Sequence, residues 1–224
     1  MPTHFQECDL GYTFKTDDVF AFFGNIRATL PEIEKEFPQF NFSKVKQTHS
    51  DIILKASAEL HEADAHWTVD KKKGLLISTA DCTPVMIHEK TSGKIASVHA
   101  GWRGVENQIV LKSLISLAES VDHPSFEIWM GPHILQKSFE VQADVLDLLL
   151  KSSYATDKNS QFVKTNSGFM VDLKNILESQ IFHSNLPVTA IHALDVDTKT
   201  DLRFHSFRRD KANSGRNLSF ITSL

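Results

Sequence analysis

The stretch LLISTADCTPVMIHEKTSGKIASVHAGWRG, residues 75–104, decides the fold. Its apolar run over residues 75–79 predicts a buried strand that residues 84–88 continue, and residues 95–98 predict another strand. Directly after it, residues 105–120 carry apolar side chains at steps of three and four, which is the period of an amphipathic helix. Strands that follow one another before a helix favour an α+β fold over a doubly wound parallel sheet.

The rest of the chain carries the same mixture of elements. Pro31 and the acidic residues of the first turn predict a helix over residues 30–37, and we also expect helices over residues 141–150 and 172–182. Short apolar segments predict strands over residues 18–23, 45–47, 52–55, 126–130, 187–192 and 218–221. Because strands and helices do not alternate strictly, we predict an α+β fold.

Length and composition are those of an ordinary globular chain of 224 residues, 41% hydrophobic and 23% charged. A net charge of −4 lacks the basic excess of a nucleic-acid-binding surface, and no apolar run reaches membrane-spanning length. The N-terminal residues lack the features of a signal peptide, and Cys8 and Cys82 are too few for a disulfide framework. We therefore expect a cytoplasmic protein with reduced thiols, no nucleic-acid partner and no membrane association.

Three short segments carry side chains that can bind a metal. His49, Cys82 and His99 each lie at the end of a predicted strand, beside turn-forming residues. Two imidazoles and one thiolate suit Zn²⁺, and three protein ligands leave a fourth position for water or substrate. Cu²⁺ can also occupy such a site in vitro. No CxxC or HExxH motif anchors the set, so a core cysteine and two structural histidines are the alternative.

These segments resemble the YfiH family, also described as the laccase-domain or multicopper polyphenol oxidase family and as a purine nucleoside phosphorylase family. The family patterns QxHGxxV, ADCxPVLL and HAGWRG have counterparts at residues 47–52, 80–87 and 99–104. The later GPxIG and RRDxxTGR patterns correspond to residues 131–135 and 208–216. The resemblance implies one catalytic domain over residues 1–224, an α+β fold of layered mixed β-sheets flanked by helices.

The resemblance also implies roles for particular residues. His49, Cys82 and His99 match the family's zinc ligands, and Cys82 and His99 would take part in catalysis as well. Arg103 would face the same cleft, where its guanidinium suits phosphate or another anion; a surface ion pair is the alternative. Glu140 matches the glutamate of the family's YEV and would position a ribose hydroxyl or act as a base. The alternative for Glu140 is a charge near the N-terminus of the following helix.

Four further residues fall in matched motifs. Arg208, Arg209 and Asp210 would close the same pocket or pair with one another, and a structural Arg209–Asp210 pair is an open alternative. Trp102 would be a core residue or a pocket wall for a flat base.

The activity implied by the resemblance is zinc-dependent phosphorolysis of adenosine or inosine, with a purine nucleoside and phosphate as small-molecule partners. Adenosine deamination and methylthioadenosine phosphorolysis are related activities. The usual deaminase signature of H-x-E with P-C-x-x-C is absent, so deamination would have to use the His-Cys-His set.

The chain departs from the family pattern in places. Ser50 and Leu135 replace family glycines, and the N-terminal R-x-GGVS and SLNLG segments have little counterpart beyond FFGN at residues 22–25. These departures bear on phosphate recognition more than on metal binding.

Three other functions remain alternatives. A multicopper oxidase needs many histidines, typically as H-x-H pairs, and the chain has no such pair. A hydrolase that edits peptidoglycan precursors is the second. A non-catalytic, zinc-stabilised binding protein is the third; it would need a closed four-ligand site, for which His133 and Cys8 are the candidate fourth ligands.

Overall fold

The computed structural model describes residues 5–224, so residues 1–4 of the predicted domain lie outside the described part. The strands are β1 (Gln6–Cys8), β2 (Gly11–Lys15), β3 (Val19–Gly24), β4 (Asn41–Lys44), β5 (Ile53–Lys55), β6 (Ala65–Thr68), β7 (Lys73–Thr79), β8 (Thr83–Glu89), β9 (Lys94–Ala100), β10 (Phe126–Met130), β11 (Glu140–Val141), β12 (Phe162–Lys164), β13 (Phe169–Val171), β14 (Val188–Ala193) and β15 (Asn217–Ser223). The helices are α1 (Leu30–Glu36), α2 (Trp102–Glu106), α3 (Ile109–Ala118), α4 (Ala143–Ser152), α5 (Leu173–His183) and α6 (Phe207–Asp210). Short 3₁₀ turns cover Gln136–Ser138, Lys158–Gln161 and Lys211–Asn213.

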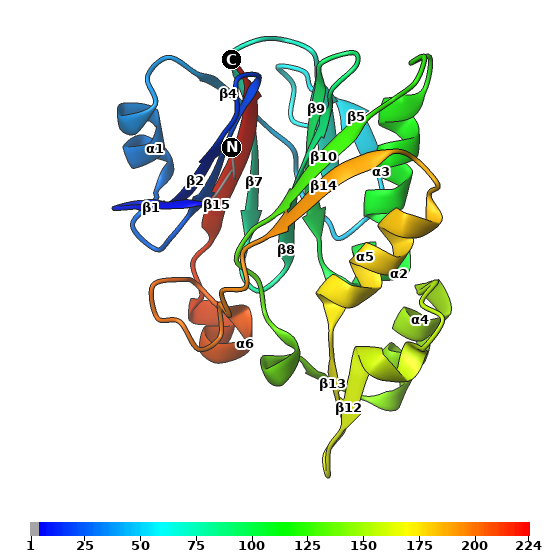
Figure 1. Cartoon of the computed structure of the whole chain (residues 1–224). Helices are drawn as coiled ribbons and strands as arrows, with labels where there is room; N and C mark the ends of the chain where they lie inside the picture. The colour runs from blue at the N-terminus through cyan, green and yellow to red at the C-terminus, as the bar shows by residue number, and fades with distance from the viewer. Residues whose placement is uncertain (1–4) are drawn as a thin grey trace.

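Two six-stranded mixed sheets stack face to face, with α1 outside the first and α2 to α5 outside the second (Figure 1). The first sheet has the order β1-β2-β3-β15-β7-β4, and only its β4–β7 pair is parallel. The second has the order β14-β10-β8-β9-β6-β5, with parallel pairs at its two edges. A small sheet of order β11-β13-β12 projects from the lower end of the molecule in Figure 1, the end that also carries α6.

Successive side chains of β7 and β8 point to opposite faces of their sheets, and this explains how the layers pack. Leu75 and Ile77 of β7 pack with Met86 of β8 in the core between the two sheets. The intervening Leu76 packs against α1, and Val85 of β8 packs against the helices on the other side. Since successive side chains of a strand point to opposite faces, each sheet is buried on both faces, and its strands read as continuous apolar runs.

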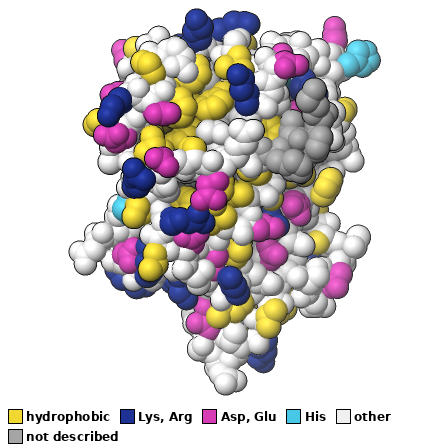
Figure 2. Space-filling view, turned by 60° about the vertical axis from the view of Figure 1, so that its left-hand side comes forward, with side chains coloured by type: hydrophobic (Ala, Val, Ile, Leu, Met, Phe, Trp, Pro, Cys, Tyr) yellow, Lys and Arg dark blue, Asp and Glu magenta, His cyan; other side chains and the backbone are white. Residues whose placement is uncertain are grey.

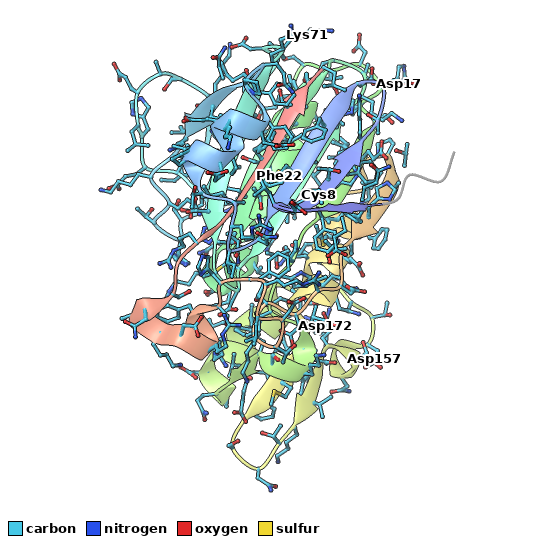
Figure 3. The ribbon with its side chains drawn as sticks, turned by 90° about the vertical axis from the view of Figure 1, so that its left-hand side faces the viewer. Cys8, Asp17, Phe22, Lys71, Asp157 and Asp172 are labelled. Carbon is cyan, nitrogen blue, oxygen red and sulfur yellow. The ribbon has the colours of Figure 1, made fainter. Side chains whose placement is uncertain are left out.

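Aromatic side chains fill the layer between the first sheet and α1. Phe22 and Phe220 lie on the paired strands β3 and β15, with ring centroids 5.4 Å apart, and both contact Phe37 at the end of α1. Figure 3 views the molecule from the side of α1, with Phe22 labelled. Figure 2, which is turned in the same direction, shows hydrophobic side chains gathered in the upper part of the surface.

The predicted α+β class is confirmed, but several predicted elements differ from those observed. Residues 84–88 do not continue residues 75–79, because the chain turns at Asp81, which has a φ of 83°, and β8 joins the other sheet. The predicted helix 105–120 is two helices, since Gln108 adopts the left-handed conformation between them. The strand expected over residues 45–47 lies earlier, at β4. No helix among residues 5–224 has both the length and the apolar character needed to cross a membrane.

Candidate metal centre and cleft

Three side chains that can bind a metal meet at one end of the stacked sheets. His49 lies on the segment from β4 to β5 and Cys82 on the segment from β7 to β8, and both segments pass from the first sheet to the second. His99 is the penultimate residue of β9 and lies opposite Pro84 of β8. This register brings Cys82 to the end of β9, so three residues far apart in sequence share one site.

The donor atoms of His49, Cys82 and His99 all lie within 4.8 Å of one another. Cys82 Sγ is 3.9 Å from His49 Nε2, and the two imidazole rings are 4.8 Å apart between centroids, at an angle of 78°. His99 is buried, Cys82 half-buried and His49 exposed, so the cluster opens to solvent on the His49 side. A thiolate and two imidazoles in this arrangement can hold one metal ion. Within residues 5–224, no other group of three His, Cys, Asp or Glu side chains converges in this way.

The buried carboxylate of Asp64 organises the cluster from behind. It lies 2.7 Å from Nδ1 of His99, which leaves Nε2 of that ring for a metal. Its two oxygens also accept hydrogen bonds from the backbone N–H groups of Thr48, His49 and Ser50, at 3.1, 3.1 and 2.6 Å. Asp64 therefore holds two of the three candidate ligands. The role of Asp64 depends on the pairing of β6 with β9, which the sequence does not show.

Electrostatics favour the metal-binding form of the thiol. Burial would raise the pKa of Cys82, but hydrogen bonds and charge from His49 and His99 lower it to about 7. Burial would lower the pKa of His99, but Asp64 and Cys82 raise it to about 9. Burial would raise the pKa of Asp64, yet His99, Ser50 and backbone N–H groups bring it to about 2. The cluster thus stabilises the thiolate, which is the form that binds metals.

The backbone is constrained at two positions of the site, His49 and Gly101. His49 has a φ of 59°, a conformation that costs energy in most residues and is maintained here by the three backbone hydrogen bonds to Asp64. Gly101 lies against the cluster, since a Cβ there would approach His49 Cδ2 to 2.9 Å and Cys82 Sγ to 3.0 Å. The absence of a side chain at residue 101 is therefore part of the site.

Two polar side chains tie the ligand segments to the rest of the fold. Gln47 pairs with the backbone of Ser78 on β7, donating to its carbonyl at 2.7 Å and accepting from its N–H at 2.8 Å. Asp81, next to Cys82, accepts from the Thr198 hydroxyl at 2.7 Å and from the backbone N–H of Arg208 at 2.6 Å. Segments from distant parts of the chain thereby fix the positions of His49 and Cys82.

The cluster forms part of a cleft of about 530 Å³. Its apolar lining comes from Trp102, Ile134, Phe139, Leu173 and Phe207, and its cationic lining from Arg103, Arg208, Lys211 and Arg216. Apolar side chains beside a few converging charged groups are typical of small-molecule sites. The structure thus brings Arg103 and Arg208 to the same cleft as the three candidate ligands.

Glu140 lies differently from the sequence expectation. Its carboxylate is absent from the cleft lining and accepts hydrogen bonds from the hydroxyls of Thr165 and Ser167, in the turn between β12 and β13. These hydroxyls lower the pKa of Glu140. Its backbone carbonyl accepts a 2.8 Å hydrogen bond from Arg208, so Glu140 contacts the cleft through another residue.

Arg209 and Asp210 pair with each other. The guanidinium of Arg209 donates two hydrogen bonds of 2.8 Å to the carboxylate of Asp210 and three more to backbone carbonyls, the shortest to Phe204. Neither residue lines the cleft. This is the structural alternative considered for the RRD motif.

Neither candidate fourth ligand reaches the cluster. The imidazole of His133 is buried, with Nδ1 2.8 Å from the carbonyl of Gly131. Cys8 is an exposed free thiol on the edge strand β1 (Figure 3). Among the residues that the structure describes, the cluster therefore has three donors and an open side.

Stacked mixed sheets with an open His-Cys-His cluster describe an α+β protein with a candidate metal centre. Residues 2–223 match the family model described as multi-copper polyphenol oxidoreductase laccase. The chain belongs to this family, known also as the YfiH family, and the resemblance seen in its sequence motifs is confirmed.

Several curated relatives carry the name purine nucleoside phosphorylase. One from Clostridium acetobutylicum is 32% identical over 184 residues, covering 79% of this chain and 75% of the relative. One from Pseudomonas aeruginosa is 29% identical, covering 80% and 73%, and YfiH of Escherichia coli is 27% identical, covering 79% and 72%.

Solved structures share the fold. YlmD from Geobacillus stearothermophilus superposes with a TM-score of 0.85 at 20% identity, covering 99% of both chains. A Neisseria meningitidis protein superposes with a TM-score of 0.79 at 22% identity, covering 93% of this chain and 95% of that one. These likenesses confirm the predicted fold of layered mixed sheets.

Proposed function

We propose that residues 1–224 form one catalytic domain, a zinc-dependent purine nucleoside phosphorylase that cleaves adenosine or inosine with phosphate. The observation that carries this proposal is the open three-donor cluster in a cleft lined by both apolar and cationic side chains. Relatives named purine nucleoside phosphorylase, one of them 32% identical, support the reaction class.

His49, Cys82 and His99 fit a zinc ion by donor type and spacing, and Gly101 leaves the room that their side chains need. When bound, zinc would supply a Lewis acid in the cleft. Asp64 would hold the imidazole of His99 in the orientation that directs Nε2 to the ion. The reduced thiol at Cys82 fits the cytoplasmic location that we propose.

The remaining lining suits the two substrates. Trp102 and Phe139 belong to the apolar lining, which would take the flat purine, and the cationic lining would take phosphate. In the reaction, a phosphate oxygen bonds to ribose C1′ while the C1′–N bond breaks, and its electron pair leaves with the purine, which gains a proton. The products are ribose 1-phosphate and the free base. Glu140 would act as a positioning residue through its hydrogen bond from Arg208.

A nucleoside panel with and without phosphate tests the proposal. Adenosine and inosine should yield free base and ribose 1-phosphate only when phosphate is present, and the purified protein should carry about one zinc, as a three-ligand site would give. Cys82→Ala should lose both zinc and turnover, whereas Cys8→Ala, at an exposed thiol, should keep both.

The same panel separates the other activities. Adenosine converted to inosine without phosphate would show deamination, and cleavage of methylthioadenosine would widen the substrate range. Copper instead of zinc in the purified protein, or full turnover by Cys82→Ala, would contradict the proposal.

A further inference from the structure

The cations that line the cleft form no ion pair with a neighbouring acid in the described residues. None of its four cations lies within 4.0 Å of a carboxylate oxygen in residues 5–224, and these are Arg103, Arg208, Lys211 and Arg216. The one acid in the lining is Asp81, and its oxygens already accept from Thr198 and the backbone of Arg208. In a chain of net charge −4, four cations without an ion-pair partner in one cleft create a local attraction for anions.

The side chain of Arg208 is held by two contacts. Its side chain is half-buried, one guanidinium nitrogen donates to the carbonyl of Glu140 at 2.8 Å, and the guanidinium carbon lies 5.3 Å from the centre of the Phe139 ring. These contacts fix the plane of the guanidinium. Its other N–H groups have no hydrogen-bond acceptor among the described residues, so they are available to an oxyanion.

Lys211 and Arg216 lie on the same C-terminal segment. Lys211 follows α6 directly, and Arg216 is held through one nitrogen by the carbonyls of Ser214 and Gly215, at 3.1 and 2.9 Å. We call Arg208, Lys211 and Arg216 the C-terminal wall. The hydrogen bond from the backbone of Arg208 to Asp81 joins this wall to the residue that precedes Cys82. This hydrogen bond therefore fixes the position of the C-terminal wall relative to the candidate metal centre.

Arg103 belongs to a different part of the chain from the C-terminal wall. Its guanidinium carbon lies 4.4 Å from the centre of the Trp102 ring, so the two side chains stack. Both residues begin α2, directly after the strand that carries His99. Arg103 therefore lies against an aromatic residue of the cleft lining.

We propose that the C-terminal wall, rather than Arg103, holds the phosphate. The inference rests on the proposed phosphorolysis and assigns the site of its anionic substrate. Three unpaired cations on one segment, one of them already oriented, can supply several charge-assisted hydrogen bonds to a dianion. Arg103 and Trp102 then flank the nucleoside.

Glutamine substitutions at the arginines test this assignment on the zinc-loaded protein. Arg208→Gln and Arg216→Gln should each raise the KM for phosphate, and the Kd for inorganic phosphate measured by calorimetry, roughly 10- to 100-fold. The KM for nucleoside and the zinc content should stay near those of the wild type. Arg103→Gln should raise the nucleoside KM instead. Arg27→Gln, at an exposed arginine outside the cleft, is the matched control and should change neither constant.

The outcomes separate the two proposals. Phosphorolysis with an unchanged phosphate KM and Kd in both Arg208→Gln and Arg216→Gln would overturn the C-terminal wall as the phosphate site while leaving the activity in place. Phosphate binding that is lost in these variants, in a protein that cleaves no nucleoside, would support the anion site and reject the proposed function. If Arg208→Gln fails to fold, Lys211→Met at an exposed side chain carries the same test.

Discussion

The carboxylate of Asp64 lies 2.7 Å from Nδ1 of His99, and both side chains are almost fully buried, at 0% and 3% exposure. A buried carboxylate is stable only when its oxygens are hydrogen-bonded, and Asp64 meets this need with three backbone N–H groups and the Ser50 hydroxyl besides the imidazole. One side chain therefore fixes both the loop of His49 and the ring of His99.

Asp64→Asn is expected to weaken metal binding. The amide keeps the size of the side chain but removes its charge, and it turns an N–H donor toward partners that are themselves donors. We expect zinc affinity, measured by competition with a chelator, to fall roughly 10- to 100-fold. Asp17→Asn, at an exposed carboxylate, should bind zinc like the wild type. Equal affinity in both variants would show that Asp64 does not orient the ligands.

Gly101→Ala should affect the metal centre more than the fold. The φ of Gly101 is −73°, which any residue adopts, so the added methyl acts only through its approach to His49 and Cys82. Moving these side chains apart should lower zinc affinity about tenfold or more, equivalent to at least about 1.4 kcal/mol. The melting temperature of the zinc-free protein should change less than that of the zinc-loaded protein. A variant with wild-type zinc affinity would contradict the crowding inferred at this position.

Glu89→Gln tests a pH-dependent contribution to stability far from the cleft. Burial alone would raise the pKa of the Glu89 carboxyl, but hydrogen bonds from the Ser92 hydroxyl and from the backbone N–H groups of Ser125, Ser92 and Thr91 lower it. A lowered pKa in the folded state stabilises the fold above the unfolded value, and this contribution is lost as the pH falls through the folded value. At neutral pH we expect the variant to be less stable by about 1–3 kcal/mol.

The check is chemical denaturation of both proteins at pH 7 and below pH 4. The stability difference between wild type and Glu89→Gln should shrink at the lower pH. Glu34→Gln, at an exposed carboxylate on α1, should show no such dependence. A difference that is constant with pH would mean that the charge of Glu89 is not what stabilises this turn.

Arg208 and Arg209 are adjacent but should respond differently to substitution. Arg209→Gln removes a bidentate pair with Asp210 and three hydrogen bonds to carbonyls, so it should lower the free energy of unfolding by about 1–3 kcal/mol. Its phosphate Kd should stay within about twofold of the wild type if it folds, since Arg209 does not line the cleft. Arg208→Gln should show the reverse, with a raised phosphate Kd and a smaller loss of stability. Denaturant titration and calorimetry on both variants measure the two effects.

The sequence predicts much of the core because strands buried on both faces read as apolar runs. Residues 126–130 are predicted as a strand, and β10 has the same bounds. The break in the helix predicted over residues 105–120 was not predictable from periodicity, because Gln108 interrupts it by backbone conformation rather than by polarity. Strands β2 and β6 were not predicted either.

The candidate site was predictable where its residues lie near strand ends, as Cys82 and His99 do, or on a segment that connects strands, as His49 does. The surroundings of these residues were not predictable, because they depend on long-range pairing. The carboxylate of Glu140 is drawn away from the cleft by Thr165, a contact that requires β11 to pair with β13. Asp64 likewise meets His99 only through the pairing of β6 with β9.

The two segments that cross from the first sheet to the second carry His49 and Cys82, so an ion held by both would act as a cross-link between the layers of the sandwich. A ligand that binds only the folded state adds its binding free energy to stability, about 4 kcal/mol at a thousandfold excess over the Kd. A rise in the melting temperature would then report that the centre holds an ion. Chelation would then lower the melting temperature as well as abolish turnover.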